Sequence, residues 1–530
     1  MVSLFLSFCL KRRWTSFASY PPMDLPDSIV RFLGILLLSV PGAPALRPVP
    51  QAYREGFASI SERDLRAWVQ FLASRELEGR ESGTRGYDVA AAFVASVLEA
   101  SGVTALGENG SYFQTFDLVQ RSWDLEGASL TCRSASGETS SIPLEGQVAA
   151  SAKGDIDWSA PWVFAGRGEG AEADAQDDFQ GLPLAERVVL LLPRPGNNHE
   201  LLGARLRGAK RVVVISDERV KARTGLSFPE VSPRMLEELL EKSGKLEVLY
   251  ITREVADRIF KLKGTSLEQL SAGGRPARFP LDGLEIRVTL RAREAHRSTR
   301  NVVGYLEGSD PVLRREVVAI GAHLDHVGTR DGRVFFGADD DASGASAVLG
   351  TAKAFAANGS RPRRSLLFLF FAAEEKGLLG SRYFVENPPV RLEQMVLELQ
   401  LDMVGRNEEL SSPDPLKAER AQDNVNSLHV VGSKVHSLEL DPWVNVVNEM
   451  VGLAFEYDEE RVYARSDQYN FGVRGVPVVF FFAGFHPDYH QPTDTADKIN
   501  YAKLFKVTRL VFSLAFEVAD RERRLARNRM

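Results

Sequence analysis

Long apolar runs recur through the C-terminal half of the chain and constrain its fold more than any other feature. They include residues 317–320, 366–371, 396–401 and 476–482, and helical patterns such as the one at 345–357 separate them. Runs this apolar are typical of strands buried on both faces, which occur in largely parallel sheets covered by helices. The sequence therefore predicts an α/β fold with a mostly parallel mixed sheet flanked by helices.

Composition narrows the classes of function. The chain has 530 residues, 44% of them hydrophobic and 26% charged, which is ordinary globular usage and suggests about two to four domains. The formal charge of −6 argues against a nucleic-acid partner, because phosphate binding relies on an excess of Lys and Arg. Only Cys9 and Cys132 are present, so no disulfide framework is possible and stability must come from buried cores.

The N-terminus has the features of a secretory leader. An apolar run at residues 32–40 follows Arg31, and residues 43–45 form an A-x-A-like cleavage signal. This pattern predicts a secreted or periplasmic mature protein, with either Met1 or Met23 as the start. The alternative is an uncleaved anchor, although the run is well short of the ~20 residues that span a bilayer. No other stretch approaches that length.

The rest of the chain divides into segments with different secondary-structure patterns. Two helical patterns open it, the first beginning at Ser61 and the second ending at Gly102. Short β-rich runs separated by Gly, Pro and acidic residues follow. We therefore expect a leader at 1–45, an N-terminal part of the main domain at 46–123, an inserted β-rich domain at 124–285, and the α/β domain at 286–530.

Acidic residues and histidines directly follow the apolar runs of the α/β domain. In such folds the carboxyl ends of the strands form the ligand-binding edge of the sheet. Carboxylates and imidazoles are ligands of divalent metals such as zinc, and one carboxylate can bridge two ions roughly 3.5–4 Å apart. The candidates are His323, Asp325, Asp340, Glu374, Glu375, Asp402 and His490.

The segments that carry these residues resemble peptidase family M28, a family of di-zinc metallopeptidases that are chiefly secreted aminopeptidases. The motifs are VVAIGAHLDH, GADDDASG, LFLFFAAEE, LELQLDMVG and FHPDYHQPTDT. The resemblance implies a zinc exopeptidase fold and two Zn²⁺ per chain. It implies that His323 and Asp402 bind one metal, that Glu375 and His490 bind the other, and that Asp340 bridges both.

The same resemblance implies further roles. Glu374 matches the general base, and because adjacent residues at a strand end point in different directions, it can stay free while Glu375 binds metal. Asp325 matches an acid that orients His323. Arg465 and Tyr489 resemble groups that hold the substrate or polarise its carbonyl, with packing or a salt bridge as the alternative. Residues from about 125 to 285 resemble a protease-associated (PA) domain.

Other residues have a simpler interpretation. For His326, His429, His436 and His486 we expect surface or local structural roles, because no motif partner accompanies them. Cys132 has no His or Cys neighbour in the sequence, which argues against a catalytic thiol.

Together these features predict a secreted zinc-dependent exopeptidase, most simply an aminopeptidase acting on peptides. A carboxypeptidase or an N-acyl amino-acid hydrolase on the same site stays open, because metal ligands do not select which end of a peptide enters. A non-catalytic receptor on this fold is the alternative of another class, and intact ligands with Glu374 argue against it. The sequence leaves the oligomeric state open.

Overall fold

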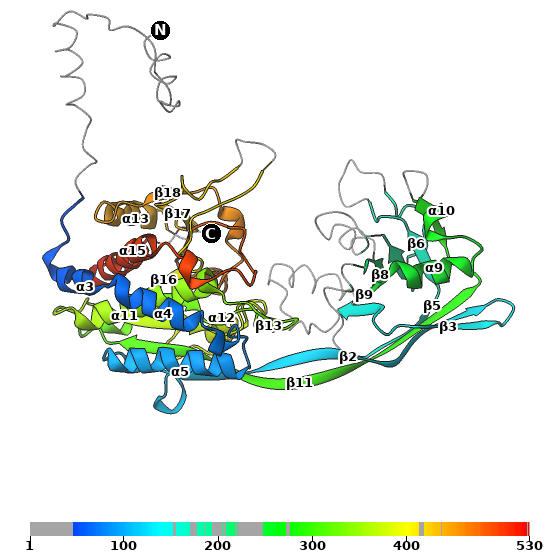
Figure 1. Ribbon diagram of the computed structural model, residues 1–530, viewed down its shortest axis with the longest axis horizontal. Helices are drawn as coiled ribbons and strands as arrows, with labels where there is room; N and C mark the ends of the chain where they lie inside the picture. Colours follow the sequence, from blue (N-terminus) through cyan, green and yellow to red (C-terminus); the bar gives the residue numbers. More distant parts are fainter. Residues whose placement is uncertain are drawn as a thin grey trace, which may run out of the picture. The chain divides into compact units, whose positions relative to one another are not determined.

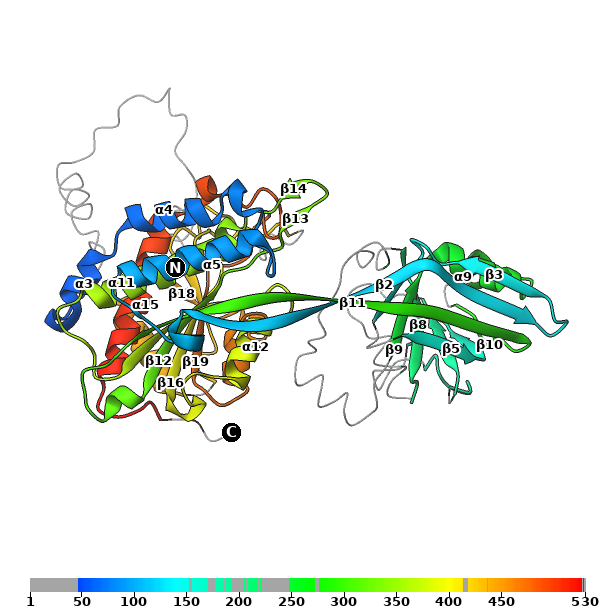
Figure 2. The ribbon, with the colours of Figure 1, turned by 90° about the horizontal axis from the view of Figure 1, so that it is seen from below.

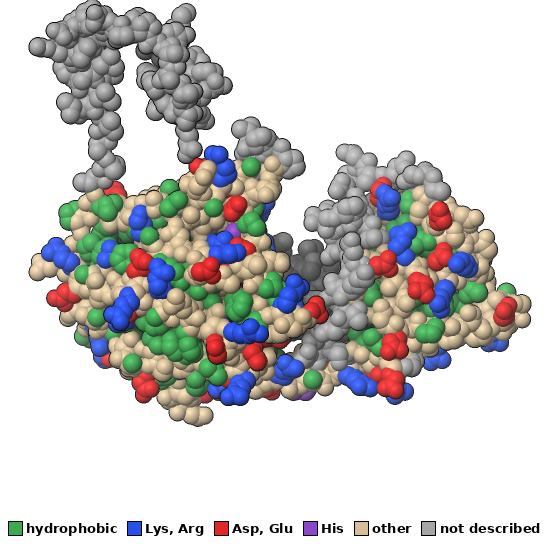
Figure 3. Space-filling model, in the orientation of Figure 1, with side chains coloured by type: hydrophobic (Ala, Val, Ile, Leu, Met, Phe, Trp, Pro, Cys, Tyr) green, Lys and Arg blue, Asp and Glu red, His purple; other side chains and the backbone are tan. Residues whose placement is uncertain are grey.

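The computed structural model describes residues 46–526 and residue 528, apart from 152–154, 170–176, 185, 193–203, 205–207, 218–219, 221–246, 272–275, 413–417 and 436. The predicted leader and His436 lie outside the described residues. None of the described helices combines the length and apolarity needed to cross a membrane. On the face drawn in Figure 3, the Lys and Arg side chains are intermingled with Asp and Glu.

Three helices open the described chain, namely α3 (Arg54–Ser59), α4 (Glu62–Leu72) and α5 (Arg85–Ala100). The Ser61 side chain caps α4 by accepting a hydrogen bond from the backbone N–H of Asp64. The apolar stripe of α4 is buried, as its helical spacing requires. Both helices expected at the start of the mature chain are therefore confirmed.

The main sheet has eleven strands in the order β18-β17-β19-β16-β12-β15-β11-β2-β3, with β1 and β5 also paired to β11. Strands β12, β15, β16 and β19 run parallel, whereas β11 and β17 are antiparallel to their neighbours β15 and β19. The expected mixed, mostly parallel sheet of the α/β domain is confirmed. The strands are β1 (Thr104–Ala105), β2 (Phe113–Ser134), β3 (Thr139–Pro143), β5 (Ile156–Ala160), β11 (Leu284–Leu306), β12 (Val317–His323), β15 (Ser365–Phe371), β16 (Met395–Leu401), β17 (Ser427–Val431), β18 (Ala454–Glu456) and β19 (Val478–Phe482).

Helices cover both faces of this sheet (Figure 1). Alternate residues of β12 belong to different cores, because successive side chains of a strand point to opposite faces. Val318 and Ile320 pack in the cluster that contains residues of α11 and α15, whereas Val317 packs with residues of α12 and α14. These helices are α11 (Gly344–Ala357), α12 (Leu379–Glu386), α14 (Gln468–Gly472) and α15 (Tyr501–Asp520), and the domain also contains α13 (Leu440–Asn448).

Residues between β2 and β11 form a second, six-stranded sheet in the order β10-β6-β7-β8-β9-β4, with cores of its own. Strands β2 and β11 pair from Phe113↔Val302 to Leu284↔Ser134, and Figure 2 shows them side by side. The expected boundaries, 123/124 and 285/286, fall inside these two strands. The elements are β4 (Val148–Ser151), β6 (Trp162–Ala165), β7 (Val188–Leu191), β8 (Arg211–Ile215), β9 (Glu247–Ile251), α9 (Arg253–Lys261), α10 (Leu267–Ser271) and β10 (Arg278–Pro280).

Candidate metal centre

Four parallel strands bring the predicted ligands to one edge of the main sheet. His323 is the last residue of β12, Glu374 and Glu375 follow β15, and Asp402 follows β16. The loop after β19 carries His490. Asp340 lies in a short π-helical segment, Ala338–Ser343, that leads into α11. The carboxyl ends of parallel strands meet at the same edge, so residues far apart in the sequence become neighbours.

Asp340 lies at the centre of the group and presents its two oxygens to different histidines. Its Oδ1 is 3.0 Å from His323 Nε2, and its Oδ2 is 3.0 Å from His490 Nε2. Asp402 Oδ1 lies 3.6 Å from His323 Nε2, and Glu375 Oε2 lies 3.1 Å from His490 Nε2. The structure thus brings the five residues together in two donor groups that share Asp340, one of which also contains His326.

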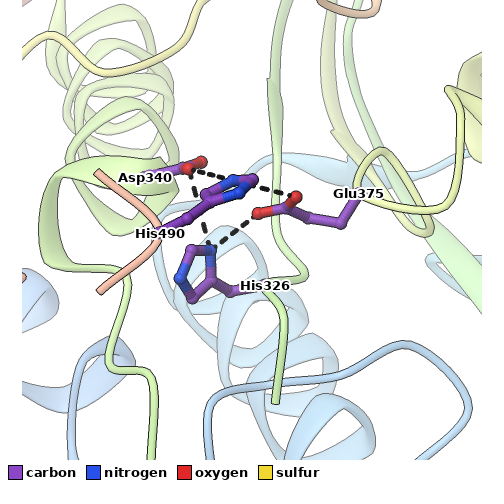
Figure 4. A group of neighbouring side chains, drawn as sticks. All are labelled: His326, Asp340, Glu375 and His490. Carbon is purple, nitrogen blue, oxygen red and sulfur yellow. Dashed lines mark ion pairs between the residues drawn. The ribbon is translucent and has the colours of Figure 1, made fainter. Parts of the chain in front are cut away.

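His326 joins this centre, although the sequence suggested a surface or local structural role. Its side chain is fully buried, and its Nδ1 lies 2.8 Å from Glu375 Oε1 and 3.9 Å from Asp340 Oδ2. Figure 4 shows the Glu375 carboxylate between the rings of His326 and His490. The one signal in the sequence was the position of His326 directly after Asp325 at the same strand end.

Glu374 has no place in either donor group but borders the pocket beside them. Its backbone N–H donates to Asp325 Oδ1 at 3.1 Å. Asp325 was expected to orient His323 through its carboxylate. The carbonyl oxygen of Asp325 is the nearer partner of His323 Nδ1, at 3.1 Å, while Oδ1 is 3.8 Å away. Asp325 therefore contacts the histidine and also fixes the backbone of Glu374.

Electrostatics distinguish the two adjacent glutamates. Burial raises the pKa of Glu374 well above its ordinary value, and the neighbouring charges of Asp402 and Glu375 add to this effect. Burial and the charge of Asp340 would also raise the pKa of Glu375. Contacts with His326 and His490 outweigh both effects and lower this pKa to about 2. Burial would lower the pKa of His490, yet Asp340 and Glu375 raise it to about 10.

The donor chemistry of this centre fits divalent metal. Carboxylates and imidazoles this close together in a buried place require protons or cations between them. Glu375 Oε1 and both ring nitrogens of His326 are buried without a hydrogen-bond partner among the described residues. Nitrogen and oxygen donors in two groups that share one carboxylate match zinc.

Asp339 and Asp341, the acids on either side of Asp340, bind backbone N–H groups of the loop after β16. Asp339 Oδ1 accepts a hydrogen bond from the backbone N–H of Gly405 at 2.7 Å, and Asp341 Oδ1 accepts one from Met403 N–H at 3.2 Å. Both contacts tie the segment 338–343 to the loop after β16. Of the three consecutive acids, only the central one presents both of its oxygens to the donor groups.

Asp494 supports the same segment and was not singled out from the sequence. Its Oδ2 accepts hydrogen bonds from the backbone N–H groups of Asp339, at 3.0 Å, and Asp340, at 3.2 Å. His486 is buried nearby, with Nε2 3.2 Å from Asp339 Oδ2, in the local structural role expected for it. Asp494 lies in the same sequence motif as His490, but nothing in that motif predicts that Asp494 binds the backbone of Asp339 and Asp340.

His429 is also buried, at a distance in the sequence from these ligands. Its Nε2 lies 3.1 Å from Glu408 Oε2, and its Nδ1 lies 3.1 Å from Asp458 Oδ1. The ring therefore bridges acids on separate segments, and with Glu408 and Glu456 it forms a third group of donors apart from those around Asp340.

A pocket with one apolar wall adjoins the donor groups. The Arg465 Nη2 donates to the Tyr489 hydroxyl oxygen at 3.2 Å, and the Arg465 guanidinium lies 5.1 Å from the centre of the Phe485 ring. Tyr489 stacks on His490, with ring centres 4.0 Å apart. The apolar wall consists of Met403, Val462, Phe480, Phe482 and Phe485.

Comparisons with known proteins identify similar families and folds. Residues 301–515 match the model of Peptidase family M28. The chain is 28% identical over 218 residues to a probable leucine aminopeptidase of Arthroderma benhamiae, covering 39% of this chain and 56% of that protein. It is 30% identical over 241 residues to the probable lipoprotein aminopeptidase LpqL of Mycobacterium tuberculosis, covering 41% and 45%. The chain thus spans about half the length of these curated relatives.

Among solved structures, an aminopeptidase from Aneurinibacillus sp. strain AM-1 shares the fold, with a TM-score of 0.55 and 19% identity over 90% of this chain and 98% of that chain. The fold, the clustered donors and the family match agree in placing residues 301–515 in a peptidase-type domain. Residues 301–515 thus match peptidase family M28, the family that the motifs resemble.

Proposed function

We propose that this protein is an exported zinc-dependent aminopeptidase that removes N-terminal residues from peptides. The observation that carries the proposal is the position of Asp340, which directs one oxygen to each histidine of two donor groups beside a pocket. His323 and Asp402 would hold one zinc ion, Glu375 and His490 the other, and Asp340 both. When bound, two zinc ions supply an activated water and polarise the scissile carbonyl.

The residues of the chain would perform the remaining steps. Glu374 accepts a proton from the attacking water and returns it to the leaving amine, a role that its raised pKa and its place at the pocket support. The Tyr489 hydroxyl donates to the carbonyl oxygen as negative charge develops there. Arg465 donates to the oxygen of Tyr489, which leaves the hydroxyl proton of Tyr489 free for the substrate.

The apolar wall of the pocket favours a substrate whose N-terminal side chain is apolar. Three phenylalanines, Met403 and Val462 offer no charged partner there. The names of relatives, such as the probable leucine aminopeptidase of Arthroderma benhamiae, are consistent with this preference. Arg465 is exposed at the same pocket and offers a site for a carboxylate, which keeps a carboxypeptidase as the second candidate.

A panel of chromogenic substrates tests the proposal. We expect hydrolysis of leucine p-nitroanilide but not of its N-acetyl derivative. Activity should vanish with a chelator and return with zinc, and metal analysis should give about two ions per chain. Preferential hydrolysis of N-blocked peptides with a free carboxylate would instead support the carboxypeptidase, and full activity in metal-free protein would contradict both.

We propose in addition that residues 124–285 form a PA-like insert, which their separate sheet and cores support. Export is proposed from the leader-like pattern of residues 1–45. N-terminal sequencing of the exported protein should give a start near Leu46. A mature chain that retains residues 28–45 would point to an anchor.

A further inference from the structure

We propose that His326 is a further metal ligand of this centre, and that its Nδ1 joins Glu375 and His490 on the second zinc ion. The five-residue set that the sequence predicted does not contain it. The inference rests on the two-metal site of the proposed function but not on the identity of the substrate.

The positions of the donor atoms support a shared ion. Glu375 turns Oε1 toward His326, at 2.8 Å, and Oε2 toward His490, at 3.1 Å. One donor atom each from His326, Asp340, Glu375 and His490 lies within 4.8 Å of all the others. Two ligand atoms of a tetrahedral zinc ion, each bonded at about 2.0–2.2 Å, lie roughly 3.4 Å apart. The distances from His326 Nδ1 to Glu375 Oε1, 2.8 Å, and to Asp340 Oδ2, 3.9 Å, lie on either side of that value.

The orientation of the His326 ring favours ligation over a simple hydrogen bond. Although Nδ1 and Glu375 Oε1 are 2.8 Å apart, neither atom has a hydrogen-bond partner among the described residues, because the pair lacks the required directionality. A ligand's lone pair points at the metal, between its fellow ligands and not at any one of them. The His326 ring does not direct Nδ1 at Glu375 Oε1, as that condition requires.

The surrounding backbone holds the ring in place. The His326 N–H donates to the carbonyl oxygen of Arg80 at 3.2 Å. The ring packs so closely against Gly337 that a Cβ there would come within 2.6 Å of His326 Cγ. The buried Arg80 guanidinium donates to the carbonyl oxygens of Leu324 and Gly337, both at 3.0 Å. The imidazole is therefore presented to the centre by a fixed loop, as preorganised ligands require.

Ligation by His326 would make the two metal positions unequal. The ion on the Glu375 side would have two imidazoles and the ion on the Asp402 side one. Removing His326 should then weaken one position selectively. A residue that only oriented Glu375 would contribute less, since loss of such partners typically costs about 10–100-fold in metal affinity.

Cobalt substitution separates the two roles without an activity assay. We would prepare wild type, His326→Ala and His326→Cys as the full chain and titrate each metal-free protein with Co²⁺ against a competing chelator. Wild type should bind two ions. His326→Ala should keep one and bind the second at least about 100-fold more weakly. His296→Asn, which changes an exposed histidine of β11 outside the donor groups, is the control and should match wild type.

The cysteine variant gives direct evidence of a bond. Nδ1 is attached to Cγ, so the short thiol side chain can reach a similar position. His326→Cys with cobalt should show a near-ultraviolet thiolate-to-cobalt absorption band that wild type lacks. Burial raises the pKa of the Cys132 thiol to about 12, and that residue lies in β2, outside the donor groups, so it should not contribute.

Either of two results would overturn this inference and leave the proposed function standing. One is that His326→Ala binds both ions with wild-type affinity, and the other is that His326→Cys binds both ions without the new band. Circular dichroism of each variant would establish that it is folded. A wild-type protein that binds fewer than two ions would overturn the proposed function as well.

Discussion

At the scale of single residues, the adjacent carboxylates Glu374 and Glu375 are chemically alike but differently placed. Ala373, just before them, has a positive φ of 56°, a conformation that costs a non-glycine residue about 1–3 kcal/mol. Its N–H donates to the Ser82 hydroxyl at 2.7 Å, and the next N–H donates to Asp325. This fixed turn directs Glu375 to the histidines and leaves Glu374 at the pocket.

The two glutamates should therefore respond differently to the same change. Glu374→Gln should keep both metals and lose about 10²–10⁴-fold in kcat, because proton transfer is removed while the donor groups stay intact. Glu375→Gln should weaken one metal position and be partly rescued by added zinc. Metal content and steady-state kinetics measured on both variants check this. Loss of metal from Glu374→Gln alone would reverse the assignment.

Lys503 provides a pH-dependent test of stability. Its side chain is buried, and Nζ donates to the carbonyl oxygens of Arg406, at 3.0 Å, and Asn424, at 2.7 Å. Burial lowers its pKa from 10.5 to about 8. At pH values between these two pKa values, Lys503 holds a proton in the unfolded chain but has released it in the folded protein. The contribution of Lys503 to the free energy of unfolding therefore rises with pH over this range.

Lys503→Met should remove this dependence. The free energy of unfolding of wild type minus that of the variant should increase by up to about 3 kcal/mol from pH 8 to pH 10.5. Urea denaturation at a series of pH values measures the difference, and other titrating groups cancel because both proteins share them. A difference that does not change over this range would show that Lys503 titrates normally.

At the scale of elements, the loop between α4 and α5 braces the segments that carry metal ligands. Arg80 is fully buried, and its guanidinium donates to the carbonyl oxygens of Leu72, Leu324, Phe336 and Gly337. Leu324 lies next to His323, and Gly337 precedes the segment that holds Asp340. One side chain thus connects the ends of two ligand segments.

Removing that guanidinium should affect both stability and metal affinity. Arg80→Met would leave several buried carbonyl oxygens without donors, and we expect a loss of about 3–5 kcal/mol in the free energy of unfolding with weaker metal binding. Urea denaturation and chelator competition measure the two effects.

Arg85→Met is the matched control for this change. Arg85 is the first residue of α5, and its side chain is exposed. The variant should stay within about 0.5 kcal/mol of wild type, as surface substitutions usually do. Because both arginines belong to the same part of the chain and carry the same charge, the difference between the two variants isolates the effect of the buried guanidinium. An Arg80→Met protein as stable as the control would show that the loop does not brace the site.

At the scale of the whole molecule, the insert is joined to the main sheet through two long paired strands. β2 and β11 keep antiparallel register where they pass the expected boundaries, and Arg121 pairs with Glu294 there. None of the proposed metal ligands lies between residues 124 and 285. The insert should therefore influence access to the site and selectivity but not metal binding.

Replacing residues 122–293 with Asn-Gly tests this separation. The two-residue turn suits antiparallel strands, so Arg121 and Glu294 can remain paired. The shortened protein should bind as many zinc ions as the full chain and should still hydrolyse leucine p-nitroanilide. Metal analysis and an activity assay check these properties, and circular dichroism checks the fold. A well-folded shortened protein without metal would contradict the proposed domain boundaries.

The sequence by itself determined the main sheet and the candidate ligands. The strands β12, β15 and β19 are apolar on both faces, and that pattern is local, so it can be recognised without coordinates. The cap of α4 at Ser61 is local in the same way. The motif resemblance singled out Asp340 from three consecutive acids, and the structure places it between His323 and His490.

The tertiary structure decided which groups meet across loops. His326 faces Glu375 because the chain turns after β12 and is held there by Arg80. Asp494 supports the segment of Asp340 from a part of the chain that is distant in sequence. Such contacts depend on the paths of several loops at once, and no periodicity or spacing within one segment encodes them. The sequence therefore determined which residues could bind metal, and only the folded chain decided how they are oriented.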